Sequence, residues 1–178
     1  MNIPNMLSLL RLLLVPVYLV VFFSEQPHAH LIAAIIFVAA GITDIVDGYI
    51  ARKYNQITKL GRILDPLADK LMVWAALISL SVVRIIPLVI TILYFIKEML
   101  LGIGGVLVYR RIRDIPPSHP LGKASTLLFF FAITVSILFD LPRTVVYLLF
   151  GITLLLMVIT VFFYIRRGLN ILKETKSK

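Results

Sequence analysis

The chain has 178 residues, of which 60% are hydrophobic, and its mean hydropathy is +1.00. Ordinary soluble domains are about 45 to 50% apolar, so this composition excludes a typical soluble protein and favours an integral membrane protein. Eighteen Lys and Arg against nine Asp and Glu give a net charge of +9. No strip of alternating basic and aromatic residues accompanies that charge, so we expect a lipid bilayer as partner and no nucleic acid.

Six apolar segments have lengths near the roughly 20 residues that a helix needs to cross a bilayer. They cover residues 5–24, 31–52, 63–83, 85–109, 121–139 and 143–165. Most prolines fall at or near segment ends, and Pro16 lies inside the first segment. Since no linker or repeat divides the chain, we expect one all-α integral membrane domain over 1–178, with six transmembrane helices.

Basic residues predict the topology of these six segments. They gather after the second, fourth and sixth segments, at Arg52, Lys53, Lys59, Arg62, Arg110, Arg111, Arg113, Lys123, Arg166, Arg167, Lys173, Lys176 and Lys178. The opposite connections carry only Arg84 and Arg143. The positive-inside rule therefore predicts a multi-pass protein of the cell membrane with both termini on the cytoplasmic side.

Four of the nine acidic residues lie within 26 residues of one another, at the ends of apolar segments. Asp44 and Asp47 are three residues apart and Asp65 and Asp69 four apart, so each pair shares one face of a helix. A carboxylate inside a membrane costs about 2.5 to 3.5 kcal/mol on insertion scales. Four of them require a compensating charge, and a bound cation is the simplest source.

Oxygen ligands without nearby His or Cys favour Mg²⁺ or Mn²⁺ over zinc, and Mg²⁺ commonly keeps positions open for substrate phosphates. Gly48, Ala51 and Gly61 lie near the aspartates, where small residues let a ligand approach the backbone. Arg52 can bind a phosphate in bidentate fashion. The set predicts a nucleotide pocket, although small residues in membrane helices more often serve helix packing.

The combined pattern Asp44-x2-Asp47-Gly48-x2-Ala51-Arg52-x8-Gly61-x3-Asp65-x3-Asp69 resembles the motif of the CDP-alcohol phosphatidyltransferase family. All eight motif positions match, and the six segments extend the resemblance over nearly the whole chain. The resemblance implies a six-helix membrane enzyme, usually a homodimer, with a polar cavity open to the cytoplasmic leaflet. It also implies that two divalent ions assist transfer of a phosphatidyl group from CDP-diacylglycerol to an alcohol, with CMP leaving.

The resemblance assigns roles to individual positions. Asp44, Asp47, Asp65 and Asp69 match the metal ligands, and Asp69 also matches the general base that deprotonates the acceptor hydroxyl. Gly48, Arg52 and Thr58 match contacts to the CDP part of the donor. The complete expected donor site is Asn5, Asp44, Asp47, Gly48, Ala51, Arg52, Thr58, Gly61 and Asp65.

The acceptor is less sharply indicated. Asn2-Ile3-Pro4-Asn5, followed by Ser8 and Arg11, is similar to the start of the bacterial phosphatidylglycerophosphate synthases, which implies sn-glycerol 3-phosphate as acceptor. Arg11, Arg113 and Lys123 are the candidate acceptor contacts. Phe129 stands where that branch commonly has glutamine, so the cardiolipin synthase alternative, with phosphatidylglycerol as acceptor, remains open.

Two hypotheses from other classes remain. Intramembrane aspartates are typical of ion paths, so a divalent cation or proton transporter is one alternative. A non-enzymatic membrane scaffold is the other, although a scaffold has no reason to keep Asp69. The clustering of the carboxylates near one membrane face favours the enzyme, and release of CMP from CDP-diacylglycerol would separate the three.

Overall fold

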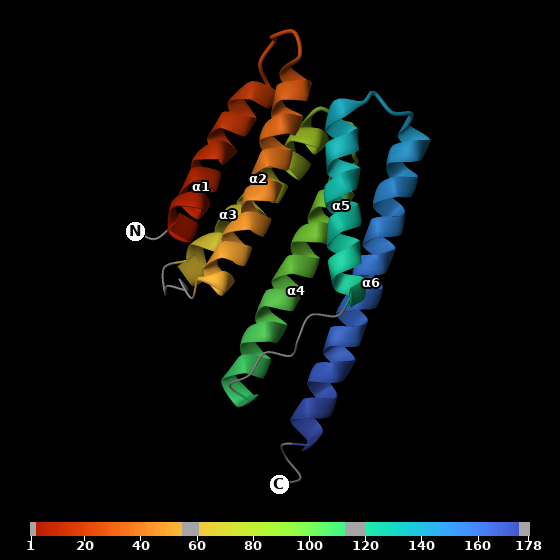
Figure 1. The fold of residues 1–178 in the computed structure, drawn as a ribbon. Helices are drawn as coiled ribbons and strands as arrows, with labels where there is room; N and C mark the ends of the chain where they lie inside the picture. Colours follow the sequence, from red (N-terminus) through yellow and green to blue (C-terminus); the bar gives the residue numbers. More distant parts are fainter. Residues whose placement is uncertain (1–2, 55–60, 113–119, 175–178) are drawn as a thin grey trace. The chain divides into compact units, whose positions relative to one another are not determined.

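The computed structural model describes residues 3–54, 61–112 and 120–174, and within them every regular element is a helix (Figure 1). The six helices are α1 Ile3–Phe22, α2 Ala29–Lys53, α3 Gly61–Val82, α4 Leu88–Ile112, α5 Pro120–Leu138 and α6 Arg143–Glu174. Each corresponds to one of the six apolar segments. The all-helical membrane fold predicted from the sequence is confirmed.

Five of the described helices, all except α3, are long and apolar enough to cross a membrane. Helix α3 has 22 residues, so a rise of 1.5 Å per residue gives it a sufficient length. Its apolar sequence is interrupted by Asp65, Asp69 and Lys70, which lie in its first half. The helix that departs from simple hydropathy is therefore one of the two that carry the motif aspartates.

Prolines mark helix starts as expected. Pro120 is the first residue of α5, while Pro87 and Pro142 directly precede α4 and α6. Pro16 lies inside α1. The largest boundary difference is at α6, which continues to Glu174, beyond the predicted end at residue 165. Hydropathy detects where the apolar stretch stops, and a helix can continue past that point with charged residues.

The chain divides into two compact units. The first unit comprises residues 1–86 and 133–141, and the second comprises 87–132 and 142–178. Helix α5 contributes to both, because the division falls within it. The expectation of a single domain over 1–178 stays a prediction, and each unit is described by itself.

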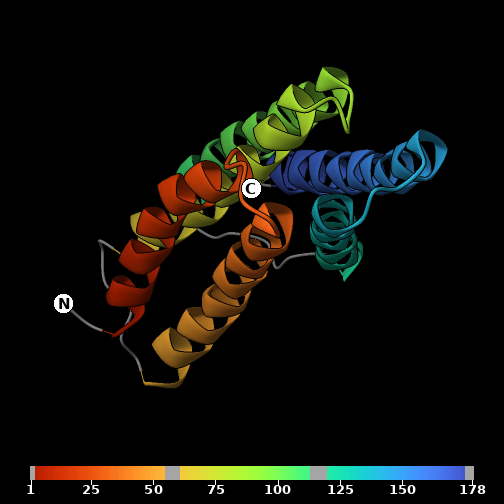
Figure 2. The same ribbon diagram turned by 90° about the horizontal axis from the view of Figure 1, so that it is seen from above.

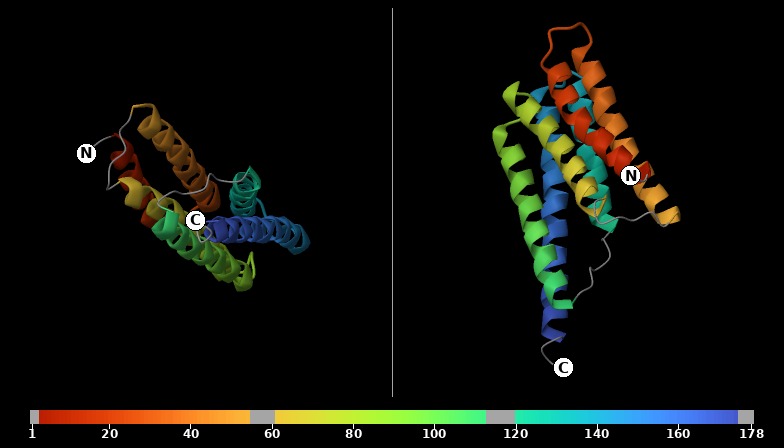
Figure 3. Two further views of the ribbon diagram at one scale, coloured as in Figure 1. Left: turned by 90° about the horizontal axis from the view of Figure 1, so that it is seen from below. Right: turned by 90° about the vertical axis from the view of Figure 1, so that its left-hand side faces the viewer.

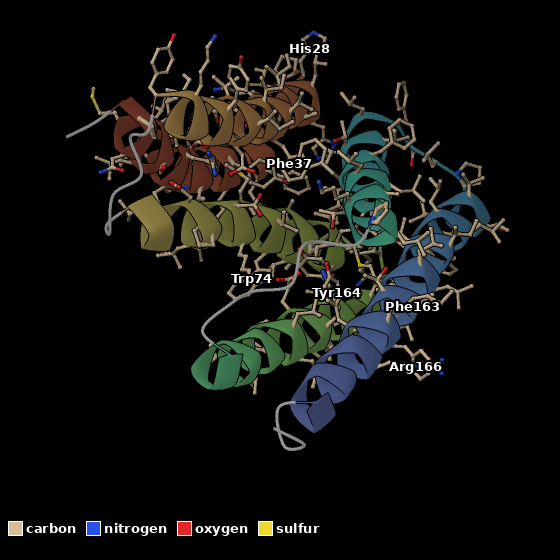
Figure 4. The ribbon with its side chains drawn as sticks, turned by 60° about the horizontal axis from the view of Figure 1, so that its bottom comes forward. His28, Phe37, Trp74, Phe163, Tyr164 and Arg166 are labelled. Carbon is tan, nitrogen blue, oxygen red and sulfur yellow. The ribbon has the colours of Figure 1, made fainter. Side chains whose placement is uncertain are left out.

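In the first unit, α1 packs against both α2 and α3 (Figures 1 and 2). Small residues line the buried face of α2, among them Ala33, Ala34 and Ala40. Phe37 lies on the same face (Figure 4), with its ring centroid 6.4 Å from that of Tyr18 on α1. Small side chains permit close helix packing in membranes, which brings the polar residues of these helices within contact distance.

In the second unit, α4 and α6 lie side by side (Figure 3). Its buried interior is aromatic: the Phe129 ring stacks on Tyr94 with centroids 4.6 Å apart and meets the Phe150 ring edge-on at 5.6 Å. Such pairs add about 0.5 to 1.5 kcal/mol beyond the burial of their area. Arg166 projects from the later part of α6 (Figure 4).

Candidate active site

A buried polar stripe runs along the first half of α1. Asn5, Ser8 and Arg11 follow one another at intervals of three residues, and their exposed fractions are 5%, 0% and 1%. That spacing places them on one face of the helix. Since buried polar groups are costly unless they are hydrogen-bonded, this face requires partners on the helices that pack against it.

Arg11 binds two aspartates of α2 at once. Its Nη1 donates to Asp44 Oδ1 at 2.5 Å, and its Nη2 donates to Asp47 Oδ2. The Asp44 side chain is 39% exposed, whereas Asp47 is 2% exposed. The three-residue spacing on α2 presents both carboxylates to one guanidinium, so a buried positive charge compensates this pair of negative charges.

Ser8 links α1 to α3. Its hydroxyl donates to Asp65 Oδ1, and the same Oγ lies 2.9 Å from the carbonyl oxygen of Pro4. Three of the four motif aspartates, drawn from α2 and α3, thus contact two α1 residues that are three positions apart. The structure thus arranges Asp44, Asp47 and Asp65 around the polar face of α1.

Asp69 lies four residues after Asp65, on the same face of α3 and at an exposed position. Ala68 between them is fully buried. On α2, Gly48 and Ala51 are partly buried, and Gly61 is buried at the first position of α3. The fourth aspartate is therefore the more accessible member of its pair.

The remaining expected site residues are described only in part. Arg52 belongs to α2, but its side chain lies outside the described part of the structure, as do Thr58 and Arg113 entirely. Lys123 is exposed in the first turn of α5, in the second unit. Arg11, expected to contact an acceptor, is instead engaged with the aspartates that were expected to hold metal.

The fit to a divalent metal can be judged from the donors. Among the residues that the structure describes, no three His, Cys, Asp or Glu side chains gather closely enough to hold a metal ion. The chemistry nevertheless fits, because Asp44 and Asp47 both bind one cation, the Arg11 guanidinium. Hard carboxylate oxygens that attract a buried cation are suitable ligands for Mg²⁺ or Mn²⁺. The metal itself stays a prediction.

Ser8 was not among the expected site residues, although it contacts a motif aspartate. The signal that could have found it is the regular spacing of Asn5, Ser8 and Arg11 in an otherwise apolar helix. Polar residues that recur on one face of a membrane helix face other protein groups and not lipid.

Comparison with known proteins relates this chain to one family. The sequence pattern of the CDP-alcohol phosphatidyltransferase family matches residues 1–166. The CDP-diacylglycerol--glycerol-3-phosphate 3-phosphatidyltransferase of Rickettsia bellii is 36% identical over 148 residues, which is 83% of this chain and 81% of that protein. The Bacillus subtilis protein of the same name is 36% identical over 79% of each chain. A cardiolipin synthase (CMP-forming) of Streptomyces coelicolor is 37% identical over 79% of this chain and 66% of its own length.

The match spans both compact units and includes all four motif aspartates. The matched region also contains the α1 residues that bind three of those aspartates. Motif, fold and relatives point to one class of membrane enzyme, and the chain belongs to the CDP-alcohol phosphatidyltransferase family.

Proposed function

We propose that the protein transfers the phosphatidyl group of CDP-diacylglycerol to sn-glycerol 3-phosphate, giving phosphatidylglycerophosphate and CMP. The observation that carries the proposal is the convergence of Asp44, Asp47 and Asp65 on the polar face of α1. Relatives named for this reaction match about four fifths of the chain. A transporter would need a trail of ionisable groups, whereas these carboxylates belong to one cluster.

The aspartates have separate roles in this proposal. Asp44, Asp47, Asp65 and Asp69 would together hold two Mg²⁺ or Mn²⁺ ions, which would neutralise negative charge on the leaving CMP phosphate. Asp69 would accept the proton of the acceptor hydroxyl as that oxygen attacks the phosphorus bonded to diacylglycerol. Its exposed position on α3 supports this role, because the acceptor must approach from outside the helix bundle.

The donor site would be built around the same helices. Small residues on α2 and at the start of α3 would let the cytidine diphosphate approach the backbone, and a basic side chain would bind its phosphates. The proposed donor contacts, apart from the aspartates, are Asn5, Gly48, Ala51, Arg52, Thr58 and Gly61.

The acceptor carries a phosphate, so cations are its natural contacts. Arg11, Arg113 and Lys123 are the proposed contacts, and the exposed position of Lys123 supports its access to a soluble anion. A second candidate is cardiolipin synthesis. The Streptomyces relative favours it, and so does Phe129, whose ring is buried against Tyr94 and Phe150 and offers no polar contact.

The location and assembly follow from charge and family. The excess of basic residues in the connections after α2 and α4 supports a protein of the cell membrane whose active site and termini face the cytoplasm. The described helices establish only that the chain is multi-pass. Membership of the family supports a homodimer.

The test is an acceptor panel. Purified protein in detergent with Mg²⁺ or Mn²⁺ would be given CDP-diacylglycerol, and CMP release would be measured with glycerol 3-phosphate, phosphatidylglycerol, inositol phosphate or serine. We expect release with glycerol 3-phosphate. Release with phosphatidylglycerol alone would assign cardiolipin synthesis, and no release with any acceptor would refute the proposal.

A further inference from the structure

We propose that Arg11 is an internal counterion of Asp44 and Asp47 that a divalent cation displaces, and that the released guanidinium then binds a phosphate group. Cation and phosphate would therefore bind cooperatively. This inference rests on the proposed function, since it assumes that these aspartates hold the metal. It concerns which group the Arg11 guanidinium binds after a metal ion has bound to the aspartates.

Two contacts hold the Arg11 guanidinium in place. The guanidinium is 1% exposed and donates through Nη1 to Asp44 and through Nη2 to Asp47. Without it, two carboxylates near the end of a membrane helix would face each other without compensation. Removing one member of a buried ion pair is destabilising, so this contact stabilises the packing of α1 on α2.

A divalent cation can reach Asp44, and it compensates the two carboxylates more completely than the Arg11 guanidinium does. Asp44 is 39% exposed, so an ion can reach that carboxylate while Asp47 stays buried at 2%. Two carboxylates and one guanidinium carry a net negative charge, whereas two carboxylates and one divalent ion are neutral. The low dielectric of the surroundings increases the value of that full compensation.

The displaced guanidinium needs a new anion, because an unpaired buried cation is costly. In the described structure its Nε already has no hydrogen-bond partner, although this atom is buried. A phosphate can accept from Nε and a terminal nitrogen together, which is the bidentate geometry that arginine favours. The buried Nε without a hydrogen-bond partner therefore favours a phosphate as the second partner of Arg11.

Thermodynamic linkage makes this exchange measurable without turnover. If the metal releases Arg11 for a phosphate, then the phosphate must strengthen metal binding by the same factor. Mn²⁺ binding to the purified protein, without CDP-diacylglycerol, can be followed by the loss of the free-ion EPR signal. We expect glycerol 3-phosphate to lower the Mn²⁺ Kd by about tenfold, within the usual range of such coupling. Glycerol is the uncharged control and should leave the Kd unchanged.

Substitution of Arg11 isolates its part. Arg11→Gln removes the competing cation, so Mn²⁺ should bind about tenfold more tightly than in the wild type, and glycerol 3-phosphate should no longer change the Kd. Arg143→Gln removes the same charge from an exposed position at the start of α6 and should keep the wild-type Kd and coupling. Arg11→Lys keeps the positive charge but lacks the planar guanidinium that can donate to two oxygens at once. This variant should fold, and glycerol 3-phosphate should lower its Mn²⁺ Kd by less than in the wild type.

The outcomes separate the two proposals. Wild-type protein that binds Mn²⁺ without any effect of glycerol 3-phosphate overturns the inference, and this measurement needs no variant to fold. Weaker Mn²⁺ binding in Arg11→Gln also overturns it, since a competing cation cannot strengthen metal binding. The proposed function is decided by the separate CMP assay. Failure of the wild type to bind Mn²⁺ would overturn the inference and would leave the proposed function to the CMP assay.

Discussion

Helix α1 of the first unit and the helices of the second unit satisfy buried polar side chains in different ways. In the first unit, Ser8 and Arg11 reach from α1 to carboxylates on other helices. In the second unit, the buried hydroxyls of Ser125, Thr153 and Thr160 donate to carbonyl oxygens of their own helices. A hydroxyl bonded within its helix needs no neighbour. A charged group that must be satisfied by another helix fixes the relation between two elements and indicates a functional site.

The ionic contacts show the same contrast. In the second unit, the ion pair of Lys97 with Glu98 joins adjacent residues of one helix, and the Lys97 ammonium lies 4.8 Å from the centroid of the Tyr94 ring. This charge is compensated locally. The Arg11 network instead joins residues more than 30 positions apart. Long-range compensation of charge thus distinguishes the aspartate region of the first unit from the aromatic region of the second.

The largest effect is expected for the proposed base. Asp69→Asn keeps the size of the side chain but removes its ability to take a proton, so CMP release should fall by about 10² to 10⁴-fold. Steady-state CMP release measures this. Asp140→Asn is the matched control, because Asp140 is exposed in the connection between α5 and α6. Turnover of Asp69→Asn near the wild-type rate would remove Asp69 from the role of base.

The aromatic region should respond in stability. Phe129→Ala removes a buried ring that contacts both Tyr94 and Phe150, so the free energy of unfolding should fall by about 3 to 5 kcal/mol. Unfolding by SDS in mixed dodecyl maltoside micelles would measure it. Phe131→Ala, two residues along the helix at a 56% exposed position, should cost much less. Equal losses would mean that the stack contributes nothing specific.

Two buried serines compare the units directly. Ser8→Ala leaves Asp65 without a donor from α1 and should cost about 1.5 to 3 kcal/mol, the usual value for a hydrogen bond to a charged group. Ser125→Ala removes a bond within one helix and should cost about 1 kcal/mol or less. The same detergent titration serves for both. If Ser125→Ala were the more costly, the contrast between the units would be wrong.

A pair of glycines on the helices of the second unit should give effects of opposite sign. A Cβ added at Gly122 would lie 3.1 Å from Thr160 Cγ2, so Gly122→Ala should destabilise by about 1 to 3 kcal/mol through overpacking. A Cβ at Gly151 meets no atom within 4 Å, so Gly151→Ala should stabilise α6 by up to about 1 kcal/mol. Opposite signs in thermal denaturation are the expected result, and a stable Gly122→Ala would show that Thr160 can move aside.

Much of the fold could be predicted because the bilayer imposes simple lengths. Apolar runs near 20 residues and prolines at their ends located all six helices. Helix α6 continues nine residues past the predicted segment, since hydropathy does not detect a helix that continues outside the apolar layer. The sequence also gave no sign that α5 contributes residues to both compact units, because that division depends on which helices pack together.

The amino-acid sequence predicted which aspartates belong to the candidate site, but not which side chains contact them. The cost of placing carboxylates in a membrane is enough to single out Asp44, Asp47 and Asp65 from the amino-acid sequence. The sequence could not say that Arg11 compensates two of them, because either a metal or a guanidinium satisfies the same charge. Nor could it identify Ser8, whose value depends on the distance between α1 and α3.

The length of α6 has a consequence for what lies outside the bilayer. A helix of 32 residues is about 48 Å long, whereas the hydrocarbon core is about 30 Å thick. Its final turns must therefore extend into the headgroup region and the water beyond. The family pattern ends at residue 166, close to where the apolar sequence of α6 gives way to paired arginines. The sequence of these last turns is rich in basic residues, which favours contact with anionic lipid headgroups at the membrane surface.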